Sequence, residues 1–167
     1  ASFGFLHALF SVHLGASQHV TGIGITLFAS SIGYYSFRIL LPSSTTPPKI
    51  EAFQPLDIPF LSDIPFFGIA LFQHTGFTYL AFLLVPVVFW LMNKTPLGLA
   101  IKVAGENPMA LEAQGVDVLF IRTVALMIGS SLMALGGAYL TMSAFDAFYF
   151  GMVNGRGWIA IALVIFA

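Results

Sequence analysis

Long apolar runs alternate with short polar segments along the chain, and three of these runs suit membrane-spanning helices. Residues 20–41, 76–92 and 120–142 fall in the ~17–25-residue range of bilayer spans, and each carries at most one charge. Two shorter apolar runs, residues 1–14 and 158–167, predict the end of an earlier span and the beginning of a later one. We therefore predict an all-α integral membrane protein with about three complete spans and two partial ones. As a helix the last run would rise only ~13–15 Å, so we expect this chain to be part of a longer protein.

The first polar segment, residues 42–65, is rich in proline and in serine and threonine. Its prolines are Pro42, Pro47, Pro48, Pro55, Pro59 and Pro65. Because proline lacks an amide hydrogen and breaks helices, this segment is predicted to be an aqueous loop. Residues 64–72 are apolar but too short to cross a bilayer, which favours a position at the membrane interface.

The second polar segment, residues 94–119, contains a short helix with strong boundary residues. Asn107 suits the N-cap, Pro108 suits the first helical position, and Gly115 suits the left-handed residue that closes a helix. The predicted helix has about two turns, a length that is marginal in isolation. We therefore expect it to be held against something else, such as a partner protein.

Lysine and arginine at the ends of the spans favour a cytoplasmic position for this second segment. The cations that flank it are Lys94, Lys102 and Arg122. The proline-rich segment has Lys49 alone, although Arg38 and Arg156 fall on the same side as Lys49 in this arrangement. Residues 42–65 are thus predicted to be extracytoplasmic.

Composition supports a lipid environment and excludes several classes of function. Apolar residues make up 58% of the chain, charged residues only 8%, and the mean hydropathy is +0.94. So little polar surface cannot coat a soluble domain of this size. A net charge of −1 with scattered cations argues against a nucleic-acid partner, and the absence of cysteine from this chain excludes thiolate chemistry within it.

Small residues recur at four-residue spacing within two of the spans, a pattern typical of close helix packing in membranes. The two rows are Gly22, Thr26 and Ser30, and Ser130, Ala134 and Ala138. Pro86 within the second span is compatible with a kink or hinge, or with a tolerated membrane proline.

Histidines and one loop aspartate were considered as functional groups. His7, His13 and His19 are six residues apart, so a continuous helix would scatter them around its axis, and we predict no metal site. Asp146 is predicted to be a solvated turn residue, with a gating role as the alternative.

Residues 98–116 resemble the cytoplasmic loop of bacterial ABC permeases for simple sugars and nucleosides, a branched-chain amino acid permease-like family. The specific core of the match is Gly105-Glu106-Asn107-Pro108. Residues 154–166 are similar to the segment that leads into a late span in the nucleoside-type members, and residues 17–22 give a weaker match. The chain departs from the pattern at Lys102, where an arginine-rich pair is common.

The resemblance implies a polytopic helical permease of the bacterial cytoplasmic membrane that imports nucleosides or simple sugars. Its partners would be ATP-binding cassette subunits, a second permease subunit and an extracytoplasmic substrate-binding protein, and it implies no cofactor. ATP hydrolysis would occur in the separate subunit, since the chain has no phosphate-binding loop motif. The residues that the resemblance assigns to ATPase coupling are Gly105, Glu106, Asn107, Pro108, Ala110, Glu112 and Gly115.

In this reading the short helix lies in a groove of the ATPase and transmits its motion to the spans. Glu106 and Glu112 would pair with basic groups of the ATPase. The alternative is a solvated loop helix without a partner.

Four polar residues near the span ends are candidates for the substrate path: Gln18, Thr21, Asn154 and Arg156. The first two side chains can hydrogen-bond a sugar hydroxyl or a base edge, and the alternative for them is contact between helices. For Arg156 the alternative is an interfacial anchor together with Trp158.

Three other classes of membrane protein would be expected to show features of their own. An ion-gradient-driven transporter of a small polar solute would be expected to place a carboxylate inside a span, yet every Asp and Glu of this chain falls outside the predicted spans. A membrane-embedded enzyme would need a convergent nucleophile and base or a metal set, and none is evident. The sequence also contains no pattern that would indicate a purely structural membrane subunit.

Overall fold

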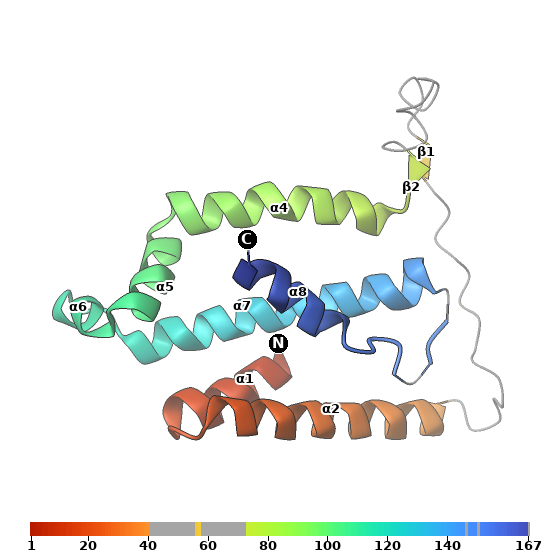
Figure 1. The fold of residues 1–167 in the computed structure, drawn as a ribbon, viewed down its shortest axis with the longest axis horizontal. Helices are drawn as coiled ribbons and strands as arrows, with labels where there is room; N and C mark the ends of the chain where they lie inside the picture. Colours follow the sequence, from red (N-terminus) through yellow and green to blue (C-terminus); the bar gives the residue numbers. More distant parts are fainter. Residues whose placement is uncertain (41–55, 58–72, 146, 150, 167) are drawn as a thin grey trace.

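The computed structural model shows helices running side by side in alternating directions (Figure 1). It describes residues 1–40, 56–57, 73–145, 147–149 and 151–166. The described helices are α1 (Ser2–Ala8), the π-helix η1 (Leu9–His13), α2 (Gln18–Leu40), α4 (Gly76–Lys94), α5 (Pro96–Glu106), α6 (Pro108–Ala113), α7 (Val118–Tyr139), the π-helix η2 (Leu140–Ala144) and α8 (Arg156–Phe166).

All three predicted spans are confirmed as long apolar helices. The segments long and apolar enough to cross a membrane are Gln18–Leu40, Gly76–Lys94 and Val118–Ala144. Each begins within two residues of its predicted position, because caps and turns at the span ends are local sequence features. The helix α4 continues through Pro86, and a hinge at this proline stays a prediction.

Almost all large apolar side chains of the described spans face outward rather than into a core. Val20, Val85 and Leu163 are each about two-thirds exposed or more, and the described buried hydrophobic residues are few. A soluble protein could not leave such a surface in water, whereas lipid tails solvate it. The all-α membrane fold class is therefore confirmed.

A tight turn joins the first two helices of the chain. Within η1 the backbone widens to a π-helix, and the amide of Ala16 donates to the carbonyl of Phe10 as the helix ends. Gly15 follows with φ of +65°, a left-handed conformation that glycine adopts at no steric cost. Helix α2 then runs back alongside α1 (Figure 1).

Helix α1 packs closely against α7 through one of the predicted small residues. A Cβ atom added at Gly4 would overlap the side chain of Ser130 and lie 3.1 Å from the carbonyl oxygen of Leu126. The predicted packing role of Ser130 is thus confirmed. The small residues predicted to pack on α2 line cavities instead. Gly22 and Thr26 line one cavity, and Ser30 lines another.

Two residues of the proline-rich segment form a minimal β-bridge. The strand β1 (Leu56–Asp57) pairs antiparallel with β2 (Gln73–His74), just before α4 begins. The rest of the predicted loop lies outside the described part of the chain. So does the whole predicted interfacial segment, residues 64–72. Across the molecule, β1 and β2 lie at the opposite end of the spans from α6 (Figure 1).

Candidate functional site

The short helix predicted around Asn107 exists and starts at the expected residues. In α6 the side-chain oxygen of Asn107 accepts a hydrogen bond from the amide of Ala110 at 3.2 Å. Pro108 occupies the first helical position, where an amide hydrogen would have no partner. The N-terminal boundary is therefore fixed by the two residues that the sequence analysis identified.

The end of α6 is closed by two backbone hydrogen bonds around a left-handed glycine. Gly115 has φ of +78° and donates its amide hydrogen to Glu112 at 2.8 Å, while the amide of Val116 donates to Leu111 at 3.3 Å. This pair of bonds is the Schellman arrangement, which satisfies the last carbonyls of a helix. The predicted role of Gly115 is confirmed in its backbone geometry.

One face of α6 packs against the chain itself. Leu111 is 4% exposed and lies in a hydrophobic cluster with Ala104 of α5 and with Val118 and Ile121 of α7. The sequence analysis expected something else, such as a partner protein, to hold this helix. The structure shows instead that its own neighbours hold the inner face, while Met109, 81% exposed, and Glu112 stand on the outside.

Helix α5, which the sequence analysis did not predict, supports α6. Like α6, it begins with a side-chain cap followed by a proline. The hydroxyl oxygen of Thr95 accepts a hydrogen bond from the amide of Gly98 at 3.1 Å, and Pro96 occupies the first helical position. Two of the expected coupling residues, Gly105 and Glu106, therefore end α5 instead of preceding a lone helix. The segment is thus two capped helices in series.

Polar contacts attach α5 to the spans on both sides. The ammonium of Lys102 donates to the side-chain oxygen of Asn93 in α4 at 2.8 Å. The guanidinium of Arg122 in α7 donates to the carbonyl oxygen of Ala104 at 3.2 Å, in the last turn of α5 where carbonyls lack helical partners. These contacts and the Leu111 cluster make α5 and α6 one supported unit at the ends of α4 and α7.

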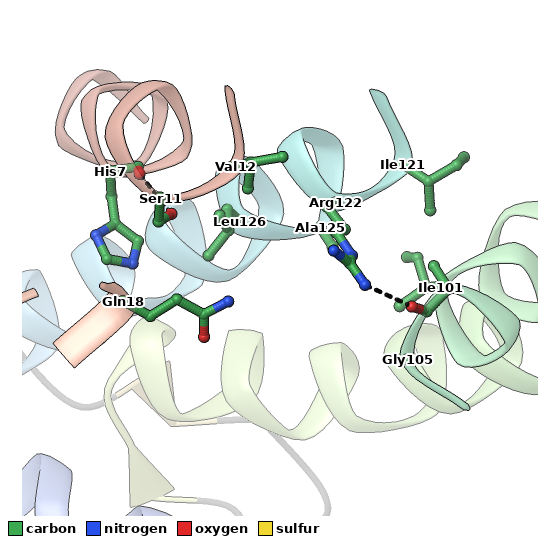
Figure 2. Close-up of a pocket in the computed structure, with 11 residues that line it drawn as sticks. His7, Ser11, Val12, Gln18, Ile101, Gly105, Ile121, Arg122, Ala125 and Leu126 are labelled. Atoms are coloured by element: carbon green, nitrogen blue, oxygen red, sulfur yellow. Dashed lines mark hydrogen bonds between the residues drawn. The ribbon is translucent and has the colours of Figure 1, made fainter. Parts of the chain in front are cut away.

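A cavity of about 460 Å³ lies beside this unit (Figure 2). Its described lining comes from α1, η1, α2, α5 and α7, and includes His7, Ser11, Gln18, Gly105 and Arg122. Figure 2 shows Arg122 reaching toward α5 on one side of the cavity and His7 and Gln18 on the other. The predicted substrate-path residue Gln18 thus shares a cavity with Gly105, one of the residues predicted to take part in coupling.

A second cavity, of about 490 Å³, adjoins the first and shares two of its residues. His7 and Gln18 line both, and the second adds His19, Gly22, Ile23, Thr26, Leu27 and Trp158. The sequence analysis read Trp158 as an interfacial anchor and Arg122 as a topological charge, and it did not place His7 here. These neighbours become visible only from the placement of α1 beside α2 and of Trp158 across the cavity from α2.

The other predicted path residues lie elsewhere. Thr21 lines a separate, mainly apolar cavity, and its hydroxyl donates to the carbonyl of Ser17 at 2.9 Å. Asn154 adopts a φ of +35°, and the guanidinium of Arg156 lies 4.8 Å above the ring of Phe145, a cation–π geometry. The four predicted path residues therefore lie in three separate places: Gln18 beside the two adjoining cavities, Thr21 beside the apolar cavity, and Asn154 with Arg156 just before and at the start of α8. Asp146 lies outside the described residues.

Two of the histidines have distinct surroundings. The ring of His7 faces Gly22, whereas Nε2 of His13 lies 3.2 Å from the hydroxyl oxygen of Thr123. Within the described residues, no group of three potential metal ligands occurs.

Comparison with known proteins places this architecture in a family. The whole chain, residues 1–167, matches the family described as "branched-chain amino acid transport system / permease component". The chain belongs to this permease family. It is a multi-pass membrane protein with the capped α5–α6 segment between two of its spans.

The names of similar proteins refer to different solutes. The chain is 33% identical over 166 residues to TsgC13 of Haloferax volcanii, named provisionally as a glucose ABC transporter permease. It is 31% identical to the guanosine ABC transporter permease NupQ of Bacillus subtilis and 28% identical to the nucleoside ABC transporter permease NupC of Lactococcus lactis. These alignments cover 97–99% of the chain but only 49–52% of the relatives, so the chain spans about half their length. No solved structure matches the chain significantly.

Proposed function

We propose that this chain is part of the membrane-spanning permease of an ABC importer, in which α6 couples ATP hydrolysis in a separate subunit to movement of the spans. The geometry of α6 carries this proposal. Its inner face is buried against α5 and α7, both of its ends are capped, and its outer face presents Met109 and Glu112. A short helix supported on one side only is suited to receive a groove-shaped partner on the other.

The importer would assemble from this permease, a second permease subunit, ATP-binding cassette subunits and an extracytoplasmic substrate-binding protein. Family membership and the names of the relatives support this assembly over an ion-gradient-driven transporter. Nucleosides and simple sugars are the proposed substrates, because the relatives' names include both classes. The proposed location is the bacterial cytoplasmic membrane, with α6 on the cytoplasmic side.

Substitutions on α6 test the coupling role. Glu112→Lys reverses an exposed charge where we expect basic groups of the ATPase, and such repulsion costs several kcal/mol at an interface. Gly115→Val places a β-branched residue at φ of +78°, a strain of at least ~1–2 kcal/mol that opens the end of α6. We expect both variants of the full-length permease to insert normally and to lower solute uptake about tenfold or more.

The measurement is ATP-driven uptake into proteoliposomes that contain the whole transporter, with ATPase activity recorded in the same samples. Glu112→Asp, which keeps the charge, serves as the matched control and should retain most uptake. Normal uptake in both Glu112→Lys and Gly115→Val would show that α6 is not the coupling element.

A further inference from the structure

The two adjoining cavities suggest a route for the solute, an inference that rests on the proposed import function. We propose that His7, Gln18 and Trp158 contact the solute along the part of its path that runs between the cytoplasmic end and the middle of this permease. The cavity of about 460 Å³ and the cavity of about 490 Å³ each have the size of a small-molecule site. They share His7 and Gln18, so these two side chains lie at the boundary between the cavities, where a solute would cross from one to the other.

The position of the cavities along the spans fits an inner path. The first cavity reaches Gly105 and Arg122 at the α6 end of the molecule. The second extends along α2 from Gln18 to Thr26, and eight residues of helix rise ~12 Å. This distance is somewhat less than half of the ~30 Å hydrocarbon core. The combined path therefore leads from the coupling segment toward the middle of the membrane.

The side chains along this path offer hydrogen bonds that the described chain does not use. The Gln18 amide has two donors and an acceptor, and the imidazole of His7 can donate or accept. Among the described residues, neither side chain has a hydrogen-bond partner. Gln18 is exposed at the start of its span, and the half-buried His7 lies beside the same cavities, so both side chains are free to hydrogen-bond water or a solute there.

The chemistry of the lining indicates the class of solute. Trp158, 76% exposed, supplies a flat apolar surface on which a nucleobase or the face of a sugar ring can stack. Arg122 is the one formal charge among the described residues lining the two cavities, and its guanidinium already donates to Ala104. With no carboxylate to receive a cation, the lining favours a neutral, hydroxyl-bearing ring compound.

Two threonines of α2 provide a matched test of which helix face lines the path. Thr26 lines the proposed path and Thr21 lines the separate apolar cavity, yet each hydroxyl donates to the carbonyl four residues earlier. Because this chain has no cysteine, Thr26→Cys and Thr21→Cys can be made in a full-length permease freed of cysteines elsewhere. Both variants would be treated, in the assembled transporter in inverted vesicles, with a negatively charged methanethiosulfonate.

We expect Thr26→Cys to react and Thr21→Cys to react at least tenfold more slowly. Saturating guanosine or glucose, added in separate arms, should slow the reaction of Thr26→Cys, and the arm that protects identifies the solute class. An unreactive Thr26→Cys, equal reactivity of the two cysteines, or absence of protection by either compound would overturn the proposed path.

Uptake measurements separate this proposal from the coupling role. Gln18→Ala removes one hydrogen-bonding group and should lower the uptake efficiency about tenfold, corresponding to a loss of ~1.4 kcal/mol. The same variant should keep ATPase activity stimulated by the loaded binding protein. Unchanged uptake by Gln18→Ala, with Glu112→Lys still uncoupled, would refute the path alone. If Glu112→Lys and Gly115→Val both transport normally while Thr26→Cys is protected, the coupling role fails and the path stands.

Discussion

Single side chains determine the shape of the segment between α4 and α7. The two helices of this segment and the span that follows it each begin with a side-chain cap. The capping residues are Thr95 for α5, Asn107 for α6 and Asp117 for α7. Asp117 accepts from the amide of Leu119 at 2.8 Å, and the other two caps accept at 3.1 and 3.2 Å. Because α6 has only six residues, losing its cap removes a large part of its local stability.

The Asn107 cap gives a prediction at this scale. Asn107→Ala should weaken α6 by about 1 kcal/mol, which corresponds to roughly fivefold faster amide exchange in residues 110–113. Hydrogen exchange of the detergent-solubilised permease measures this effect directly. Asn107→Ser, which restores an oxygen acceptor, should return exchange to near the wild-type rate. Equal exchange in the Ala and Ser variants would mean that packing of Leu111 alone holds the helix.

The sequence predicts these local features unevenly. Asn107, Pro108 and Gly115 predict both ends of α6, because their residue types suit the first and last positions of a helix and their spacing leaves about two turns between them. Thr95 and Pro96 are the same N-cap and proline combination, and they could have predicted α5. The apolar residues that follow them are as compatible with a loop between two spans as with the buried face of a helix, so the sequence alone does not decide between the two.

At the scale of elements, α5 joins α4 by a very close approach. A Cβ atom added at Gly98 would overlap the carbonyl of Leu91 and lie 2.6 Å from the Cα of Met92. The hydroxyl of Thr95 also donates to Leu91 at 2.6 Å, so the chain turns sharply between the two helices. Glycine is needed at position 98 because backbone atoms cannot yield as a flexible side chain can.

Gly98→Ala should therefore destabilise the junction by about 1–3 kcal/mol, the usual cost of overpacking. A lower thermal unfolding midpoint of the full-length permease in detergent is the expected result. Gly129→Ala in α7 is the matched control, since a Cβ atom there meets nothing within 4 Å and alanine favours the helix. A midpoint unchanged by Gly98→Ala would show that the α4–α5 junction opens freely.

The candidate path could not be predicted from local patterns. Gln18 was chosen from its residue type and position, but its neighbours His7 and Trp158 come from other helices, one of them at the far end of the sequence. Thr21 was grouped with Gln18 because both lie in the first turn of a span. On the helix the two side chains line different cavities. Which face of α2 lines the candidate path depends on where α1 and α8 lie.

At the scale of the whole molecule, the spans alternate in direction and leave two chemically different ends. One end carries α5, α6 and the cavity beside Gly105, and the other carries η2, the paired strands β1 and β2, and the cation–π pair of Arg156 and Phe145 (Figure 1). The outer face of α6 can meet a cytoplasmic ATPase only if its end of the molecule faces the cytoplasm. Lys94, Lys102 and Arg122 at this end support that orientation through the positive-inside rule.

Orientation is tested by placing one cysteine at each end of the full-length permease. Met109→Cys lies on the outer face of α6, and Ala144→Cys lies at the exposed end of η2. A membrane-impermeant maleimide added to intact cells should label Ala144→Cys and spare Met109→Cys, and inverted vesicles should reverse the pattern. Since the α6 end cannot face the extracytoplasmic side and still meet a cytoplasmic motor, labelling of Met109→Cys in intact cells would exclude the coupling role. The helices would keep their packing in that case, but the path beside Gln18 would then open outward, and the solute would enter where we expect it to leave.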